Sequence, residues 1–223
     1  MSEFSAGRRL ASVIAATAAV AAALLGPVAV APTASAQPCP DVTVVFARGT
    51  SEPAGIGRVG QAFADSLQAQ LPGRTVATYA VNYPATYDFL GASAGANDAT
   101  AYISSLASQC PSSRVVLGGY SQGAAVVDML SGVPPLGNKV GEIGSAPPLP
   151  SNLAGNVAGA VAFGNPSTKF GIPLTAGTFG GRAIDLCSDG DPICSDGRNP
   201  FAHTSYERGP MPADAASFIA GRI

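Results

Sequence analysis

The sequence predicts an α/β fold in which helices cover both faces of a parallel sheet. Five apolar runs rich in β-branched residues punctuate the chain, and helical patterns lie between them. Several of these runs show no alternation of apolar and polar residues, which is typical of strands buried on both faces. Strands that alternate with helices favour a parallel sheet. We therefore expect one domain built as a three-layer α/β/α sandwich.

The expected elements follow one another in a regular order. The five strand candidates are Val42–Ala47, Thr75–Val81, Arg114–Gly119, Val157–Gly164 and Arg182–Cys187. In the segment Arg58–Leu71 apolar residues recur every four positions, which indicates a helix. Further helices are expected at Ala92–Ser108, Gln122–Leu130 and Ala213–Ile223. Sheets of this kind carry their sites at the carboxyl ends of the strands, so we expect the chemistry there.

The first 36 residues are expected to be a secretory signal peptide. Arg8 and Arg9 form its positive end, an uncharged stretch rich in Ala, Val and Leu runs from Leu10 to Ala31, and Ala34-Ser35-Ala36 fits a cleavage site. An uncleaved membrane anchor is the alternative, although Gly26-Pro27 interrupts the apolar stretch. The arginine pair leaves Sec and twin-arginine export open. The mature domain, residues 37–223, is expected outside the cell, with attachment to the cell envelope left open.

The composition argues against a nucleic acid as partner. Charged residues make up 12% of the chain, and the formal net charge is −2. The sequence contains no basic run that could follow a phosphate backbone.

Four cysteines remain after the expected cleavage: Cys39, Cys110, Cys187 and Cys194. An even number in an exported chain predicts two disulfides. Cys187 and Cys194 are close in sequence and are expected to close a small loop, which leaves Cys39 to pair with Cys110. A zinc site is the alternative, but the chain has no C-x-x-C pair and its single histidine is needed elsewhere. We expect no metal.

The pattern G-x-S-x-G occurs twice, around Ser93 and around Ser121. This motif carries a nucleophile when a sharp strand-to-helix turn raises the serine above a sheet and the flanking glycines leave room for the turn. Ser121 follows an expected strand and precedes an expected helix. Ser93 follows a segment with poor strand character, so we expect it at the start of a helix. The context therefore favours Ser121 as the nucleophile of an acyl-transfer enzyme.

A serine hydroxyl needs a base to take its proton, and His203 is the one histidine of the chain. It follows the last expected strand, where the base stands in this order of elements. An acid must orient the imidazole. Asp189 and Asp191 both lie in the turn bounded by Cys187 and Cys194. The residues alone do not separate these two aspartates.

The oxyanion that forms during acyl transfer needs backbone N–H donors. One is expected from Gln122, directly after the nucleophile. The other is expected from the loop after the first strand, Arg48-Gly49-Thr50-Ser51-Glu52.

The chain resembles the cutinase family, and most closely the cutinase-like proteins of actinobacteria. The resemblance covers nearly the whole mature chain, from about Cys39 onward. It rests on four features: the segments Val44–Thr50, Gly118–Ala124 and Cys187–Cys194, and His203. It departs from fungal cutinases in the loop Asn165–Gly181, which leaves the natural substrate open.

The resemblance implies more than the residues alone. It selects Asp191 over Asp189, and it makes Thr50 the second oxyanion donor through its N–H and its hydroxyl. Asn82 is the position that supports this hydroxyl in relatives. The implied fold is a small α/β-hydrolase with a five-stranded parallel sheet and no large lid. Loops at Pro84–Leu90 and Ser195–Ala202 would flank the cleft.

The implied activity is hydrolysis of carboxylic esters with short or medium acyl chains, without metal or cofactor. We expect an ester or lipid substrate, transient contact with a lipid surface, and a monomer. The alternatives on the same fold are a deacetylase of polysaccharides such as acetylxylan and a hydrolase of lipids or phospholipids. A surface antigen without catalysis is the alternative from another class.

Overall fold

A parallel five-stranded sheet organises the residues from Pro38 to Ile223 in the computed structural model, with the strand order β2-β1-β3-β4-β5. The structure describes residues 38–136 and 143–223. The expected signal peptide, residues 1–36, therefore lies outside the described residues. The strands are β1 (Val42–Ala47), β2 (Val76–Ala80), β3 (Arg114–Tyr120), β4 (Val157–Phe163) and β5 (Ala183–Leu186).

The five expected strands are confirmed, and all neighbouring pairs are parallel. The longer helices are α1 (Gly57–Gln70), α2 (Ala92–Gln109), α3 (Gln122–Leu130) and α7 (Met211–Ala220). Shorter helices are α4 (Ser151–Ala154), α5 (Pro166–Lys169) and α6 (Pro200–His203). The last long helix begins two residues earlier than expected. Its first turn contains Pro212, which is tolerated there because the first N–H groups of a helix have no partner within it.

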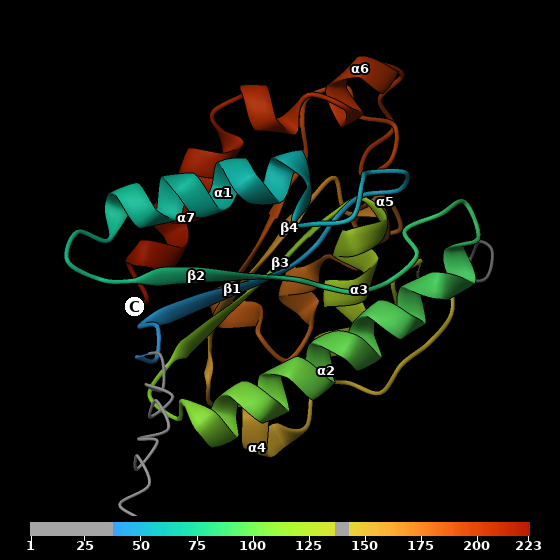
Figure 1. Ribbon diagram of the computed structural model, residues 1–223. Helices are drawn as coiled ribbons and strands as arrows, with labels where there is room; N and C mark the ends of the chain where they lie inside the picture. The colour runs from blue at the N-terminus through green and yellow to red at the C-terminus, as the bar shows by residue number, and fades with distance from the viewer. Residues whose placement is uncertain (1–37, 137–142) are drawn as a thin grey trace, which may run out of the picture. The chain divides into compact units, whose positions relative to one another are not determined.

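Helices cover both faces of the sheet, as the sequence predicts (Figure 1). The side chains of β1 divide between the two layers, because neighbouring residues of a strand point to opposite faces. Val42, Val44 and Phe46 pack in a cluster with residues of α1 and α7. Val45 and Ala47 belong to the other cluster, which contains residues of α2 and α3. This arrangement leaves the carboxyl ends of the strands at one edge, where the loops that follow them meet.

Both expected disulfides are confirmed. Cys39 pairs with Cys110 and joins the start of the described chain to the end of α2. Cys187 pairs with Cys194 and closes a loop directly after β5. Within the described residues, no helix is long and apolar enough to cross a membrane.

Candidate active site

Ser121 occupies the sharp turn between β3 and α3. Its backbone has φ 57° and ψ −117°, a conformation that L-residues rarely adopt. A Cβ on Gly119 would lie 2.1 Å from the carbonyl oxygen of Gly123, and one on Gly123 would lie 1.9 Å from that of Ala47. Both glycines are therefore required for the close approach of β1, β3 and α3. The backbone N–H of Ser121 donates to the carbonyl oxygen of Phe163 at 2.9 Å, which fixes the turn on β4.

The second copy of the motif has a different structure. Ser93 lies in the first turn of α2, as expected, and its hydroxyl donates to the backbone oxygen of Leu90 at 2.9 Å. This hydroxyl makes a local contact with the backbone at the start of α2, whereas that of Ser121 faces His203.

The structure brings Ser121, His203 and Asp191 together, although they are far apart in sequence. The Nε2 atom of His203 lies 2.8 Å from the Ser121 hydroxyl, and its Nδ1 atom lies 2.7 Å from Oδ2 of Asp191. His203 ends the short helix α6, which Asn199 caps by accepting a hydrogen bond from the N–H of Phe201. The backbone oxygen of His203 also accepts a hydrogen bond from the Tyr120 hydroxyl at 2.5 Å. Hydrogen bonds to the backbone oxygen and to the ring of His203 thus fix the position of its imidazole.

Asp191 has no solvent exposure, and three hydrogen-bond donors surround its carboxylate. Besides His203, the Tyr206 hydroxyl donates to Oδ2 at 2.7 Å and the N–H of Ile193 donates to Oδ1 at 2.8 Å. Burial raises the pKa of Asp191, but these hydrogen bonds outweigh it and hold the pKa below its ordinary value of 3.8. Asp191 is therefore a carboxylate at neutral pH and can stabilise a charged imidazole.

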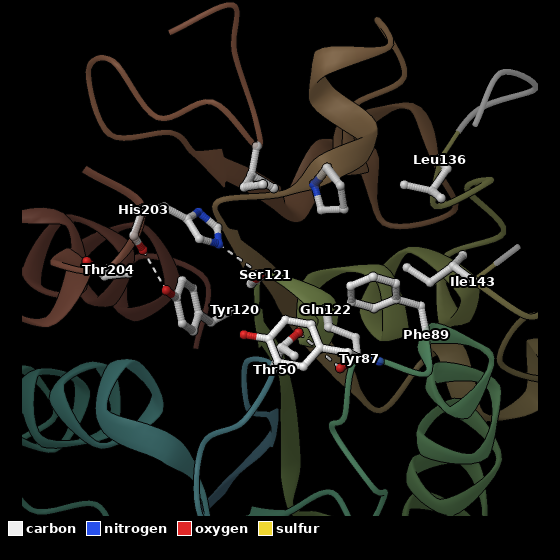
Figure 2. A pocket seen from close by; sticks show the side chains of 12 residues that line it. Thr50, Tyr87, Phe89, Tyr120, Ser121, Gln122, Leu136, Ile143, His203 and Thr204 are labelled. Atoms are coloured by element: carbon white, nitrogen blue, oxygen red, sulfur yellow. Dashed lines mark hydrogen bonds between the residues drawn. The ribbon is translucent and has the colours of Figure 1, made fainter. Parts of the chain in front are cut away.

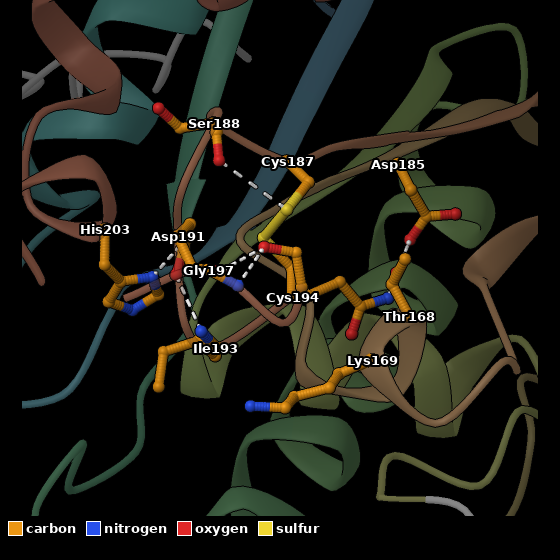
Figure 3. The surroundings of a disulfide bond; sticks show 12 residues. Thr168, Lys169, Asp185, Cys187, Ser188, Asp191, Ile193, Cys194, Gly197 and His203 are labelled. Carbon is orange, nitrogen blue, oxygen red and sulfur yellow. Dashed lines mark hydrogen bonds and ion pairs between the residues drawn. A yellow bond between two sulfur atoms is a disulfide. The ribbon is translucent and has the colours of Figure 1, made fainter. Parts of the chain in front are cut away.

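The Cys187–Cys194 loop contains both aspartates that the sequence offers as the partner of His203, and their positions in the loop differ. Figure 3 shows Asp191 beside the disulfide with its carboxylate toward His203. Asp189 lies in the same loop but is exposed. The two sulfur atoms and Asp191 lie close enough together to resemble a metal-binding group. Because both sulfur atoms belong to the disulfide, neither is available as a thiolate ligand.

Sequence reasoning missed Tyr206, although it lies at the centre of this region. Its hydroxyl accepts a hydrogen bond from the N–H of Ser188 at 2.9 Å while it donates to Asp191. Burial raises the pKa of Tyr206 far above its ordinary value, and the hydrogen bond to Asp191 adds to this effect. The tyrosine therefore keeps its proton and joins Ser188, directly after Cys187, to the Asp191 carboxylate. No motif marks this residue in the sequence.

The loop after β1 carries Thr50 and is fixed by the buried side chain of Arg48. One guanidinium nitrogen of Arg48 donates to the backbone oxygen of Tyr83 at 2.8 Å, and Nε donates to that of Glu52 at 3.0 Å. The Tyr83 hydroxyl donates in turn to the backbone oxygen of Arg48. These bonds join the ends of β1 and β2. They hold Thr50 next to Gln122, where the Thr50 hydroxyl donates to Oε1 of the glutamine at 3.2 Å.

Among the described residues, the Asn82 side chain makes no hydrogen bond to Thr50, and support by Asn82 stays a prediction from the resemblance. After β2 the chain alternates, with Val81 and Tyr83 buried and Asn82 exposed between them. The backbone N–H of Asn82 donates to Asp98 at 2.8 Å. The side chain of Gln122 takes the place beside the Thr50 hydroxyl.

A cavity of about 410 Å³ opens over Ser121. Thr50, Gln122 and His203 line it near the serine, and Figure 2 shows Phe89, Leu136 and Ile143 grouped on the opposite side. The expected flanking loop Pro84–Leu90 contributes to the wall with two aromatic residues. The other expected loop, Ser195–Ala202, contributes none of the lining residues, whereas His203 and Thr204 directly after it line the cavity. Sequence reasoning also missed Leu136 and Ile143.

The family model described as Cutinase matches residues 38–223. The chain belongs to the cutinase family. "Phospholipase Culp4" of Mycobacterium tuberculosis is 51% identical over 220 residues, which covers 98% of this chain and 93% of that protein. "Probable carboxylesterase Culp3" of the same species is 48% identical over 196 residues, covering 86% of this chain and 72% of that one.

Solved structures agree with this family. A Trichoderma reesei cutinase in complex with a phosphonate inhibitor has a TM-score of 0.64 at 34% identity, covering 82% of this chain and 77% of that one. The catalytic core of acetyl xylan esterase from the same fungus has a TM-score of 0.68 at 25% identity, covering 83% of this chain and 100% of that one. This cutinase-family protein is an α/β-hydrolase that hydrolyses carboxylic esters.

Proposed function

We propose that this cutinase-family enzyme hydrolyses esters through an acyl-enzyme on Ser121. The chain of hydrogen bonds from Ser121 through His203 to Asp191, at the floor of a largely apolar cavity, carries the proposal. His203 takes the hydroxyl proton as Ser121 attacks the ester carbonyl, and Asp191 stabilises the imidazolium that forms. The imidazolium then protonates the departing alcohol. Water attacks the acyl-enzyme in the second half by the same proton transfers.

The oxyanion of each tetrahedral intermediate is stabilised, in this proposal, by Thr50 and Gln122. The N–H of Gln122 is in the first turn of α3, where N–H groups lack partners within the helix. The Thr50 hydroxyl now donates to the Gln122 side chain. The bond to Gln122 keeps the Thr50 hydroxyl within the site before attack. As charge develops on the substrate oxygen, the hydroxyl rotates and donates to the oxyanion instead.

Replacement of Thr50 by valine is expected to lower kcat by roughly 10²-fold, the usual cost of losing one oxyanion donor. Valine keeps the shape of the side chain and the backbone N–H but removes the hydroxyl. KM for a soluble ester should change little, because the charge that this hydroxyl meets exists only after attack. Steady-state kinetics of wild type, Thr50→Val and Thr50→Ser provide the test. The serine variant should recover most of kcat, and full activity in Thr50→Val would remove the hydroxyl from the mechanism.

The apolar wall favours medium acyl chains over acetate. Phe89, Leu136 and Ile143 offer apolar surface beside Ser121, and each methylene buried there is worth about 0.8 kcal/mol. We expect kcat/KM for p-nitrophenyl esters to rise from acetate to hexanoate or octanoate. Ile143→Asp should reduce the rate on octanoate and leave that on acetate nearly unchanged. A steady fall of kcat/KM from acetate onward would favour a deacetylase instead.

A lipid or phospholipid substrate is the second candidate. Tyr87 and Phe89 line the cavity and are exposed, Tyr87 to 78%, and Phe201, two residues before His203, is 76% accessible. These side chains suit transient contact with a lipid surface, at which a monomer would act. "Phospholipase Culp4" is the name of one relative. Turnover of phosphatidylcholine vesicles beside a soluble octanoate ester distinguishes the two substrate classes.

We further propose that residues 1–36 direct export of the enzyme and that residues 37–223 form the mature domain. The two disulfides support an oxidising compartment as its destination. N-terminal sequencing of the protein from culture medium tests cleavage before Gln37.

A further inference from the structure

A buried carboxyl group lies behind the site and takes no part in the mechanism above. Asp128 belongs to α3, the helix that follows Ser121, and its side chain has no solvent exposure. Its Oδ1 atom accepts a hydrogen bond from Nδ2 of Asn165 at 3.0 Å. Its Oδ2 atom is buried and has no hydrogen-bond partner in the part of the chain that the structure describes. A full negative charge in this position would be poorly compensated.

A second carboxyl group shares the same amide. Nδ2 of Asn165 also donates to Oδ1 of Asp185 at 2.8 Å. The same oxygen accepts a hydrogen bond from the Thr168 hydroxyl at 3.2 Å, which Figure 3 shows. Asp185 is only partly buried and has the better supply of donors. Two carboxylates joined by one neutral amide repel each other, which favours a proton on the more buried of the two, Asp128.

The surroundings of Asp128 favour its protonated form. Burial raises the pKa of Asp128 well above its ordinary value, against hydrogen bonding from Ser167 and Asn165, and the charge of Asp185 raises it further. Asp185 is the ionisable group that acts on Asp128 within residues 38–136 and 143–223. The hydroxyl of Ser167 is also buried and has no hydrogen-bond partner among the described residues. A proton on Oδ2 would make Asp128 a donor, and Ser167 is the hydroxyl that acts on its carboxyl group.

This polar cluster joins the helix of the nucleophile to the segment behind the base. Gly164 contacts His203 so closely that a Cβ there would lie 2.9 Å from Cε1 and 3.0 Å from Nδ1 of the ring. Pro166 lines the cavity. Asn165 stands between them, and its Oδ1 accepts the N–H of Ser167 at 3.1 Å. Any shift of this segment moves the surface against which the imidazole rests.

We propose that Asp128 is a positioning residue, uncharged in the working enzyme, that donates to Ser167 and so holds the segment Gly164–Ser167 against α3 and His203. The proposal rests on the role given to His203 above. A carboxyl that stays protonated in the folded state but ionises in the unfolded state stabilises the fold most at low pH. Its contribution is complete below the unfolded pKa, near 3.8, and is lost as pH rises toward the folded pKa.

The stability test compares wild type with Asp128→Asn, which is uncharged at every pH. Urea unfolding is measured from pH 4 to pH 9. The unfolding constant of wild type, divided by that of the variant, is expected to increase with pH by up to about tenfold per unit until Asp128 ionises in the folded protein. Ser131→Ala, which removes another buried hydroxyl at the end of α3, should give a constant ratio. A constant ratio for Asp128→Asn as well would overturn the proposal, whatever the activity.

The kinetic test asks whether the cluster positions the base. Asp128→Asn should retain kcat within about threefold, because the amide can still donate to Ser167, whereas Asp128→Ala should lose about tenfold or more. Ser167→Ala, a smaller change that is expected to fold, should lower kcat severalfold with KM nearly unchanged. Equal losses in the asparagine and alanine variants would mean that the charge is needed. Wild-type kcat in both Asp128→Ala and Ser167→Ala would rule out positioning.

Discussion

Replacement of Ser121 by alanine is expected to lower kcat for ester hydrolysis by about 10⁴- to 10⁶-fold, the range found when a nucleophile is removed from such a site. The hydroxyl makes its hydrogen bond to His203 and takes no part in the core, so the fold should survive. The backbone strain at this position is the same for alanine as for serine. The measurement is steady-state turnover of a soluble octanoate ester, with circular dichroism and a melting curve for the variant.

Ser93→Ala is the matched control, because Ser93 stands in the other copy of the same five-residue motif. Its hydroxyl donates only to the backbone oxygen of Leu90, so the variant should retain wild-type kcat and lose about 1 kcal/mol of stability or less. Wild-type activity in Ser121→Ala, or a large loss of kcat in Ser93→Ala, would contradict the assignment of Ser121 as the nucleophile.

Replacement of Asp191 by asparagine is expected to lower kcat by about 10⁴-fold. The amide cannot stabilise the imidazolium, and with its nitrogen toward Nδ1 it would select the wrong tautomer of His203. Tyr206 also loses the charged acceptor of its hydroxyl. Because the folded state depresses the pKa of Asp191, wild type gains stability from this carboxylate above pH 3.8, and it loses that gain as pH falls through the lower folded pKa.

Asp189→Asn is the control within the same disulfide loop. The Asp189 side chain is exposed, and we expect kcat within about twofold of wild type. The comparison is made at pH 7 on both variants, with melting curves from pH 3 to pH 7. A large loss of kcat in Asp189→Asn, with Asp191→Asn active, would mean that Asp191 is not the residue that supports His203.

The framework of the fold could be predicted because its signals are local. Apolar β-branched runs identified all five strands, and helical spacing identified the long helices. The elbow at Ser121 was predictable for a related reason, since a strand, two glycines and a helix follow one another directly in the chain. The single histidine and the four cysteines limit the possible bases and disulfide pairings, so His203 and both disulfides could be predicted from the sequence.

The remaining features depend on contacts between distant segments. The surroundings of Asn82 could not be predicted, because the path of the chain after a strand ends is set by the following loop. Tyr206 carries no local signal, because its role exists only where it meets Asp191 and Ser188. The sharing of Asn165 between two carboxyl groups likewise requires α3, β5 and the turn after β4 to be brought together.

The central claim is that Ser121 is the nucleophile of a serine esterase, and covalent labelling tests it most directly. The purified enzyme is treated with an alkyl p-nitrophenyl phosphonate, digested and examined by mass spectrometry. One phosphonyl group per chain is expected, on the peptide that contains Ser121, and Asp191→Asn should slow its formation without moving it. Labelling of the peptide that contains Ser93, or no labelling of a folded protein that turns over esters, would contradict this account.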